Sequence, residues 1–496
     1  MRAETEGNPA GAGGASPRVV VVGGGVAGLT AALRLLDAGA GVTLLEASER
    51  LGGKLRTGEI GGVRVDLGAE SMLARRPEAV GLAREAGLAD ALQPPATASA
   101  SLWTRDALRP MPKGHVMGVP ADPASLAGVL SEEGVARIAE DRALPRTEVG
   151  EDIAVGEYVA ARVGREVVDR LVEPLLGGVY AGNAYRISLR AAVPQLFAAA
   201  REHTSLTEGV RAIQARTAAD PRTDPVFMGI DGGVGRLPLA VADTVRARGG
   251  RIRTGTPVTG LARVPGGWRL TTGTSDAPES LEADAVVLAV PAPQAARLLA
   301  AELPAASADL AEIEYASMAL MTFAFRADEA ELPHGSGFLV PPVDGRTVKA
   351  ATFAGRKWRW IAEQEPGLHV VRTSVGRHRE EEILGRDDAG LLALARRDLK
   401  AATGVDAEPV DAHVTRWDQG LPQYPVGHLA RVARVRDQVA KAPGLALCGA
   451  AYDGVGIPAC VASATGAARQ VMAARQVMAA RPQGDPASGP SGHAGE

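Results

Sequence analysis

Three glycines near the start of the chain have the spacing of a phosphate-binding turn. Gly23, Gly25 and Gly28 follow the apolar run Val19–Val22 and precede a segment rich in alanine and leucine. In such a turn the first glycine permits the tight bend, the second lets a phosphate approach the backbone, and the third lets the following helix pack closely. The N-terminus of that helix would attract the negative charge of the phosphates. This spacing predicts a bound nucleotide.

A single carboxylate stands where the ribose of that nucleotide would lie. Glu46 follows the apolar run Val42–Leu45 and comes eighteen residues after Gly28. A carboxylate at this position accepts hydrogen bonds from both ribose hydroxyls and repels a 2′-phosphate. The sequence therefore favours NAD or FAD over NADP.

A second glycine turn, flanked by basic residues, bears on the choice between NAD and FAD. Arg50, the pair Gly52-Gly53 and Lys54 follow in a pattern that resembles the flavoprotein amine oxidase superfamily, where this turn contacts FAD. An ordinary solvated basic loop is the competing interpretation. A reductase fed by NAD(P)H would need another dinucleotide turn, and the best candidate, Gly229–Pro238, lacks the required spacing. We expect that segment to be a turn entering a helix, and dioxygen to be the simplest electron acceptor.

The elements that position these residues have the order of a doubly wound sheet. A strand at Val19–Val22, a helix at Ala27–Gly39 and a strand at Val42–Glu46 form a βαβ unit. Further short strands are predicted within 249–264, 267–272 and 284–291. The fold class is therefore α/β, with a Rossmann-like FAD-binding domain.

The rest of the chain is predicted to form a helical insertion and an α+β domain. The segment Val155–Leu176 is the clearest amphipathic helix, and Gly156 and Gly164 are expected to interrupt it. Residues 313–428 mix strands with a helix at 389–404, which indicates an antiparallel sheet with helices. The expected domains are a discontinuous FAD-binding domain (17–76, 228–300 and 441–481), a substrate-binding domain (77–112 and 301–440), a mainly helical domain (113–227) and disordered tails (1–16 and 482–496).

Composition argues against several classes of protein. The net charge of −4 removes the electrostatic basis for binding nucleic acid. Two cysteines without a CxxC pair and eight histidines without metal-ligand spacing give little support to a disulfide framework or a metal centre, and they favour a reduced, cytoplasmic chain. The first sixteen residues lack the apolar segment of a secretory signal. Residues 442–468 carry one charge, but their prolines favour a buried loop and helix over a membrane span, and peripheral membrane contact stays open.

Four longer motifs, in order, resemble the protoporphyrinogen/coproporphyrinogen oxidase family of haem biosynthesis. They are Glu173–Leu196, Gly232–Ala242, Trp417–Arg431 and Cys448–Cys460, and with the N-terminal pattern they extend over most of residues 18–470. The resemblance implies non-covalently bound FAD. It assigns FAD contacts to Gly23, Gly24, Gly25, Val26, Ala27, Gly28, Glu46, Ala47, Arg50, Lys54, Gly68, Ala69, Glu70, Ser71, Val258, Trp417, Val455, Gly456 and Ile457.

The same resemblance implies a reaction. Members oxidise a porphyrinogen to a porphyrin by removing six electrons in three steps, and dioxygen is reduced to hydrogen peroxide in each. Eukaryote-type protoporphyrinogen oxidases place a substrate arginine where this chain has Ala100. This departure resembles the Gram-positive branch, which uses coproporphyrinogen III. We therefore expect a coproporphyrinogen III oxidase, with protoporphyrinogen IX oxidation as the alternative, and an amine oxidase or a non-catalytic flavin-binding protein as less favoured ones.

The reaction is expected to depend on positioning of the substrate rather than on a catalytic acid or base. No Ser/His/Asp or Cys/His set is recognised, so no catalytic acid or base is predicted. We expect a substrate-facing loop at Gly177–Tyr180, which includes Gly178, with the C-terminal turn of a helix as the alternative for these glycines. Arg75 and Arg76 are candidate carboxylate-binding groups. A ferrochelatase is a possible recipient of the product.

The late glycine turn at Asp453–Pro458 is interpreted as the other end of the same cofactor site. A helix beginning near Pro458 would direct the positive end of its dipole at the flavin. This would favour the reduced, anionic flavin by on the order of 1 kcal/mol.

Overall fold

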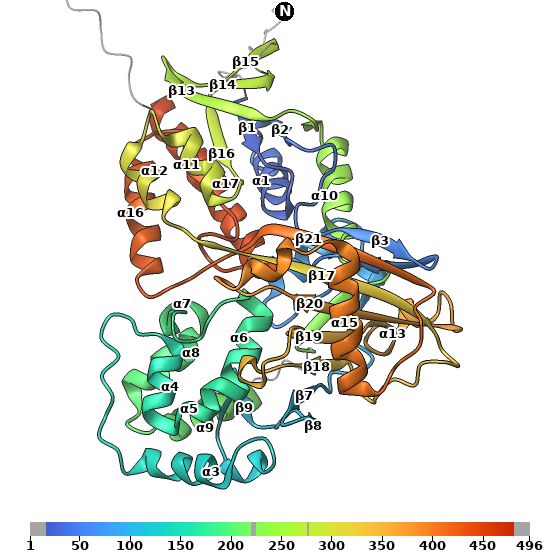
Figure 1. The fold of residues 1–496 in the computed structure, drawn as a ribbon. Coiled ribbons are helices and arrows are strands. Elements are labelled where there is room, and N and C mark those ends of the chain that lie inside the picture. Colours follow the sequence, from blue (N-terminus) through green and yellow to red (C-terminus); the bar gives the residue numbers. More distant parts are fainter. Residues whose placement is uncertain (1–15, 220–224, 275–276, 481–496) are drawn as a thin grey trace, which may run out of the picture.

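A five-stranded parallel sheet organises the upper part of the molecule in Figure 1, in a computed structural model that describes residues 16–219, 225–274 and 277–480. β1 (Arg18–Val22) lies at its centre, between β2 (Gly41–Leu45) and β16 (Ala285–Leu288). β12 (Arg251–Arg253) and β22 (Leu445–Leu447) form its edges. Apart from residue 16, the predicted tails lie outside the described residues.

Helices cover both faces of this sheet because its strands are apolar on both sides. Val19 and Val21 belong to one hydrophobic core, and Val20 and Val22 belong to another. The first core is closed by α1 (Val26–Asp37), α2 (Pro77–Glu85), α10 (Arg236–Ala247) and α17 (Ile457–Ala480), and the second by α11 (Ala292–Leu299), α12 (Pro304–Ala311), α16 (His428–Ala440) and strands β13 (Val258–Val264), β14 (Gly267–Thr274) and β15 (Ala277–Ala283). The predicted doubly wound α/β fold is confirmed.

A seven-stranded sheet crosses the middle of the molecule (Figure 1). Its neighbours are antiparallel except for one parallel pair, which joins residues 101–102 to 338–339. In order the strands are β21 (Asp411–Pro422), β17 (Tyr315–Arg326), β20 (Leu368–Val375), β19 (Ala350–Phe353), β18 (Gly337–Leu339), β7 (Ser101–Thr104) and β8 (Ala107–Pro110). One face packs against α15 (Asp388–Thr403), at the position predicted for a helix.

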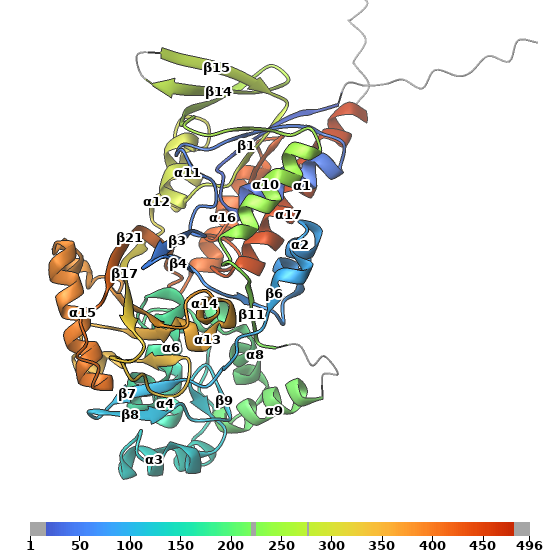
Figure 2. The same cartoon turned by 90° about the vertical axis from the view of Figure 1, so that its right-hand side faces the viewer.

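Helices form the lower part of the molecule, as Figures 1 and 2 show. α4 (Val155–Val163) ends at Gly164, whose φ of 95° disfavours other residues, as expected. Gly156, however, lies inside α4 and does not interrupt it. A Cβ there would stand 2.8 Å from the Tyr185 ring, so this glycine permits close packing. α5 (Arg165–Val167) and a π-helical turn at Val168–Val172 then lead into α6 (Glu173–Tyr180), and α3 (Glu132–Ala139), α7 (Leu189–Ala192), α8 (Pro194–Glu202) and α9 (Leu206–Ala218) complete this part.

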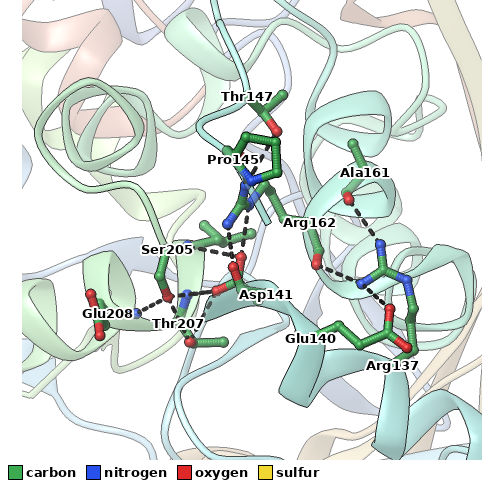
Figure 3. Close-up of polar contacts among 11 residues, drawn as sticks. Arg137, Glu140, Asp141, Pro145, Thr147, Ala161, Arg162, Ser205, Thr207 and Glu208 are labelled. Carbon is green, nitrogen blue, oxygen red and sulfur yellow. Dashed lines mark hydrogen bonds and ion pairs between the residues drawn. The ribbon is translucent and has the colours of Figure 1, made fainter. Parts of the chain in front are cut away.

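A buried ion pair ties these helices together (Figure 3). Arg162 of α4 donates from Nε to the Asp141 carboxylate at 2.7 Å, and both side chains are fully buried. Asp141 also accepts hydrogen bonds from the amides of Leu206 and Thr207 and from the Ser205 hydroxyl, at the start of α9. One carboxylate therefore fixes the beginning of α9 against α4.

Two further sequence predictions concern single segments. Gly229–Pro238 forms the end of β11 (Phe227–Ile230), a turn and the start of α10, as predicted. Residues 442–468 form β22, a loop and the first part of α17. Within the three described ranges, no helix combines the length and the apolar character needed to cross a membrane. The predicted domain boundaries stay a prediction.

Candidate active site

The parallel strands bring the predicted contact residues to one edge of the five-stranded sheet. β1 ends immediately before Gly23, β2 ends immediately before Glu46, and β22 ends before the turn that leads to α17. Ligands of open parallel sheets bind outside the carboxyl ends of the strands. α1 follows β1 and α17 follows β22, so both helices begin at this edge. They pack side by side on one face of the sheet (Figures 1 and 2).

The glycines of the first turn differ in what surrounds them. A Cβ on Gly23 would lie 2.5 Å from the Ala289 carbonyl oxygen, and one on Gly28 would lie 1.9 Å from the Gly23 carbonyl oxygen. At Gly25 the nearest atom is the Cα of Gly53, at 3.9 Å. Gly23 and Gly28 therefore serve the turn and its packing, whereas Gly25 leaves backbone open to a ligand. This arrangement fits a phosphate at the start of α1, next to Gly24, Val26 and Ala27.

Glu46 is held in place by its surroundings. One carboxylate oxygen accepts the Gly24 amide at 2.6 Å, and the other accepts the amide and the hydroxyl of Ser48, each at 2.8 Å. An ionised carboxylate has about four acceptor positions, so about one remains for a ribose hydroxyl. The Glu46 carbonyl accepts the amide of Thr256, which places Val258, the first residue of β13, close to Glu46 and the exposed Ala47.

The basic turn meets an aromatic ring from the other sheet. The Arg50 guanidinium and the Lys54 ammonium lie 5.9 Å and 5.8 Å from the Trp417 ring centroid. Arg50 also donates to the Gly53 carbonyl at 2.8 Å, and the Trp417 indole donates to the Leu67 carbonyl at 2.9 Å. Two cations gathered beside Gly53, opposite Gly25, fit the diphosphate of a dinucleotide.

The turn Gly68–Ser71, which includes Ala69, connects this site to the seven-stranded sheet. Glu70 accepts hydrogen bonds from Lys357 at 2.5 Å and from Arg372 at 2.6 Å, and Arg372 also donates to the Gly68 carbonyl at 2.6 Å. Burial alone would raise the pKa of Glu70, but the two cations outweigh it and lower the pKa to about 2. Glu70 is therefore a carboxylate that fastens Arg372 of β20 to the site. Sequence reasoning missed both cations, because each lies more than 280 residues away from Glu70.

The late glycine turn is held by a tyrosine that sequence reasoning also missed. The Tyr424 hydroxyl accepts the Gly454 amide at 2.8 Å and donates to the Ala450 carbonyl at 2.6 Å. The nearest atom to a Cβ on Gly456 is the Pro458 Cδ, at 3.7 Å, so this backbone is open. α17 begins at Ile457, one residue before the predicted Pro458, and Val455 packs against the helical part of the molecule.

The predicted substrate residues have a different setting from the one expected. Gly177–Tyr180 is the last turn of α6 and not a loop, since Ala181 ends the helix in a left-handed conformation with φ of 49°. No atom lies within 4 Å of a Cβ built on Gly177, and only Leu339 Cδ2, at 3.9 Å, approaches one on Gly178. A Cβ on Gly177 would therefore meet open space, whereas Leu339 of β18 stands at contact distance from Gly178, and the role of this turn in substrate binding stays a prediction.

The two candidate arginines immediately precede α2. The Arg76 guanidinium pairs with Glu78 at 2.7 Å, and Arg75 is exposed. α2 packs on α17 in the first core. Their proposed contact with substrate carboxylates stays a prediction.

Comparison with known proteins identifies the family. Residues 26–472 match the model of the flavin-containing amine oxidoreductases. The coproporphyrinogen III oxidase of Mycobacterium tuberculosis is 40% identical over 458 residues, which cover 91% of this chain and 96% of that protein. Human protoporphyrinogen oxidase is 30% identical, covering 92% and 98%. The crystal structure of a candidate protoporphyrinogen oxidase from Exiguobacterium sp. 255-15 superposes with a TM-score of 0.82 at 34% identity, covering 93% and 100%. The resemblance expected from the motifs is confirmed, and the chain belongs to the flavin-containing amine oxidoreductase family, in the group that includes the coproporphyrinogen III oxidases.

Proposed function

We propose that this chain oxidises coproporphyrinogen III to coproporphyrin III in haem biosynthesis, with non-covalently bound FAD and with dioxygen as the electron acceptor. The observation that carries the proposal is the open backbone at Gly25 beside Arg50 and Lys54, which fits a dinucleotide. The pairing of Glu70 with Arg372 joins this region to the sheet that contains β18. The coproporphyrinogen III oxidase of Mycobacterium tuberculosis, which matches 91% of this chain at 40% identity, is named for this substrate and supports its choice. The proposal includes a cytoplasmic location and a ferrochelatase as recipient of the product.

The residues present fit FAD along its length. Glu46 would hold the ribose and Gly25, with the turn of Arg50 and Lys54, the diphosphate. The open backbone at Val455–Ile457 and the turn Gly68–Ser71 would hold the ring system, and the N-terminus of α17 would stabilise negative charge there by on the order of 1 kcal/mol. When bound, the flavin supplies a two-electron acceptor for hydride leaving the substrate.

The remaining task of this chain is to position the macrocycle. Open space lies beside Gly177 of α6, and Leu339 of β18 lies beside Gly178, so both elements would border the ligand. Positioning of this kind accelerates a reaction by fixing the reacting atoms at close range, without a protonating side chain.

The test is a direct comparison of the two porphyrinogens. The purified chain should bind FAD and form porphyrin from coproporphyrinogen III with a kcat/KM at least about tenfold above that for protoporphyrinogen IX. Porphyrin fluorescence and peroxide release measure both reactions. A higher kcat/KM for protoporphyrinogen IX would show that protoporphyrinogen IX is the preferred substrate. Oxidation of primary amines, without oxidation of either porphyrinogen, would show that the chain acts as an amine oxidase.

A stopped-flow experiment separates catalysis from mere flavin binding. Under anaerobic conditions, coproporphyrinogen III should bleach the flavin absorbance of the wild-type protein. Failure to bleach, together with absence of porphyrin from either substrate, would reject the proposed function.

A further inference from the structure

The open end of α6 lies beside a cation that has no carboxylate partner. Ala181 ends α6, and its carbonyl accepts the His378 amide at 2.7 Å. The neighbouring Arg377 donates from Nη2 to the Val340 carbonyl at 3.3 Å. Val340 follows Leu339, the residue nearest to Gly178. These contacts place the Arg377 guanidinium where α6 meets the end of β18.

The neighbours of Arg377 are paired, but Arg377 is not. His378 and Arg379 both pair with Glu314, at 2.8 Å and 2.7 Å. Among residues 16–219, 225–274 and 277–480, no carboxylate oxygen lies within 4.0 Å of the Arg377 nitrogens. Glu173 and Glu380 act on it only at longer range. A half-buried cation without a counter-ion is costly, which is the condition that a bound anion would relieve.

A second basic side chain, that of Lys349, lies near Arg377. Lys349 is 7% exposed, and its ammonium donates to the Gly376 carbonyl at 2.8 Å. Burial and the charge of Arg377 lower the pKa of Lys349 to about 7. Lys349 and Arg377 are thus neighbouring basic groups, and among the described residues no carboxylate forms an ion pair with either.

The position of this pair suits the periphery of a large ligand. Arg372, on β20, binds Glu70 and the Gly68 carbonyl at the proposed flavin site. Val375 lies about 10 Å farther along β20, at about 3.3 Å per residue, and Arg377 lies beyond it. A ligand that reaches from the flavin turn across the face of α6 would bring its outer groups toward Arg377.

We propose that Arg377, supported by Lys349, binds a peripheral carboxylate of the substrate and so determines specificity. The inference rests on the proposed function, because a porphyrinogen supplies the propionate groups. A guanidinium offers two parallel donors to a carboxylate, which suits this task. Arg76, in contrast, is already paired with Glu78.

Removal of the charge at position 377 tests the assignment. Arg377→Met should raise the KM for coproporphyrinogen III by about tenfold or more, with kcat changed less than about twofold. The dissociation constant of coproporphyrin III, measured by fluorescence quenching on the oxidised protein, should rise in parallel. Arg377→Lys should restore part of both values. Arg379→Met, which removes an exposed neighbouring arginine, should leave both at the wild-type level.

The possible failures are distinguishable. An active wild type with unchanged KM and unchanged product binding in Arg377→Met overturns the inference and leaves the proposed function in place. A wild type that oxidises no porphyrinogen overturns the proposed function and with it the inference. If Arg377→Met does not retain flavin, Lys349→Met and Arg377→Gln provide the same comparison, and wild-type product affinity in both overturns the assignment.

Discussion

Glu46 accepts the Gly24 amide at 2.6 Å, so the residue expected to bind ribose also fixes the glycine turn. Glu46→Ala removes both contacts, and it should weaken FAD binding by about tenfold or more. Glu46→Gln keeps one acceptor oxygen, so its affinity for FAD should lie between that of Glu46→Ala and that of the wild type. Reconstitution of the apoprotein, followed by flavin fluorescence, measures the dissociation constant. The exposed Glu49→Gln is the control, and wild-type affinity in Glu46→Ala would contradict the role of Glu46.

The glycines at positions 25 and 28 should respond differently to the same substitution. Gly25 has φ of −75°, and its Cβ position is open, so Gly25→Ala should fold normally but bind FAD at least about tenfold more weakly. In Gly28→Ala the new Cβ would overlap the Gly23 carbonyl oxygen, at 1.9 Å, so the loss of stability should reach about 3 kcal/mol or more. Thermal unfolding and flavin content separate the two effects. Unaltered FAD binding by Gly25→Ala would exclude a phosphate at this turn.

Gly456→Asp should separate flavin retention from helix stability. An acidic side chain just before α17 interacts favourably with the helix dipole, so the unfolding temperature of the apoprotein should not fall. The same charge would oppose the anionic reduced flavin, so the variant should retain less FAD and have a lower flavin potential. Gly456→Ala is the uncharged control. Wild-type FAD content and turnover in the Asp variant would show that this turn does not contact the flavin.

Local patterns were enough to predict the strand, glycine turn and helix on which the proposed cofactor site is built. The strand, glycine turn and helix from Arg18 to Asp37 are contiguous in sequence, and Glu46 ends the next strand. The fold class followed because short β-branched runs bounded by glycine alternate with a longer helical pattern, which is the order of a βαβ unit.

Other features depend on packing between distant segments. Gly156 looked like a helix break, but the helix continues because the missing side chain accommodates Tyr185. Gly177 and Gly178 looked like a loop, but Leu176 and Tyr180 are buried and keep this segment in α6. Arg372 lies on β20 and Lys357 follows β19, so both approach Glu70 only because of how the seven-stranded sheet is assembled. The sequence near Glu70 carries no signal for that assembly.

Glu173, the first residue of α6, should make stability depend on pH. Burial raises its pKa to about 7, although the Ala184 amide and the charge of Arg377 act in the opposite direction. A raised carboxyl pKa means that the folded state favours the protonated form, so its contribution is present below about pH 4.5 and is lost as pH rises through 7. Between about pH 5 and pH 8, the free energy of unfolding of the wild type should fall by up to about 3 kcal/mol more than that of Glu173→Gln. Chemical denaturation at both pH values measures this difference, with the exposed Glu157→Gln as control. An equal pH dependence in wild type and Glu173→Gln would contradict it.

The buried pair of Arg162 and Asp141 should be the most sensitive point of the helical part. Asp141→Asn or Arg162→Met leaves one charge buried without its partner, and each should lower the free energy of unfolding by about 3–5 kcal/mol. Arg165→Met breaks a pair in which the arginine side chain is 77% exposed, so it should have far less effect than either core variant. Urea denaturation measures all three.

Because α4 leads through the π-helical turn into α6, loosening this pair should also affect the proposed substrate face while leaving the flavin turns intact. The two core variants should therefore retain FAD but show a raised KM for coproporphyrinogen III. Loss of FAD before any change in KM would show instead that the helical part supports the cofactor site directly.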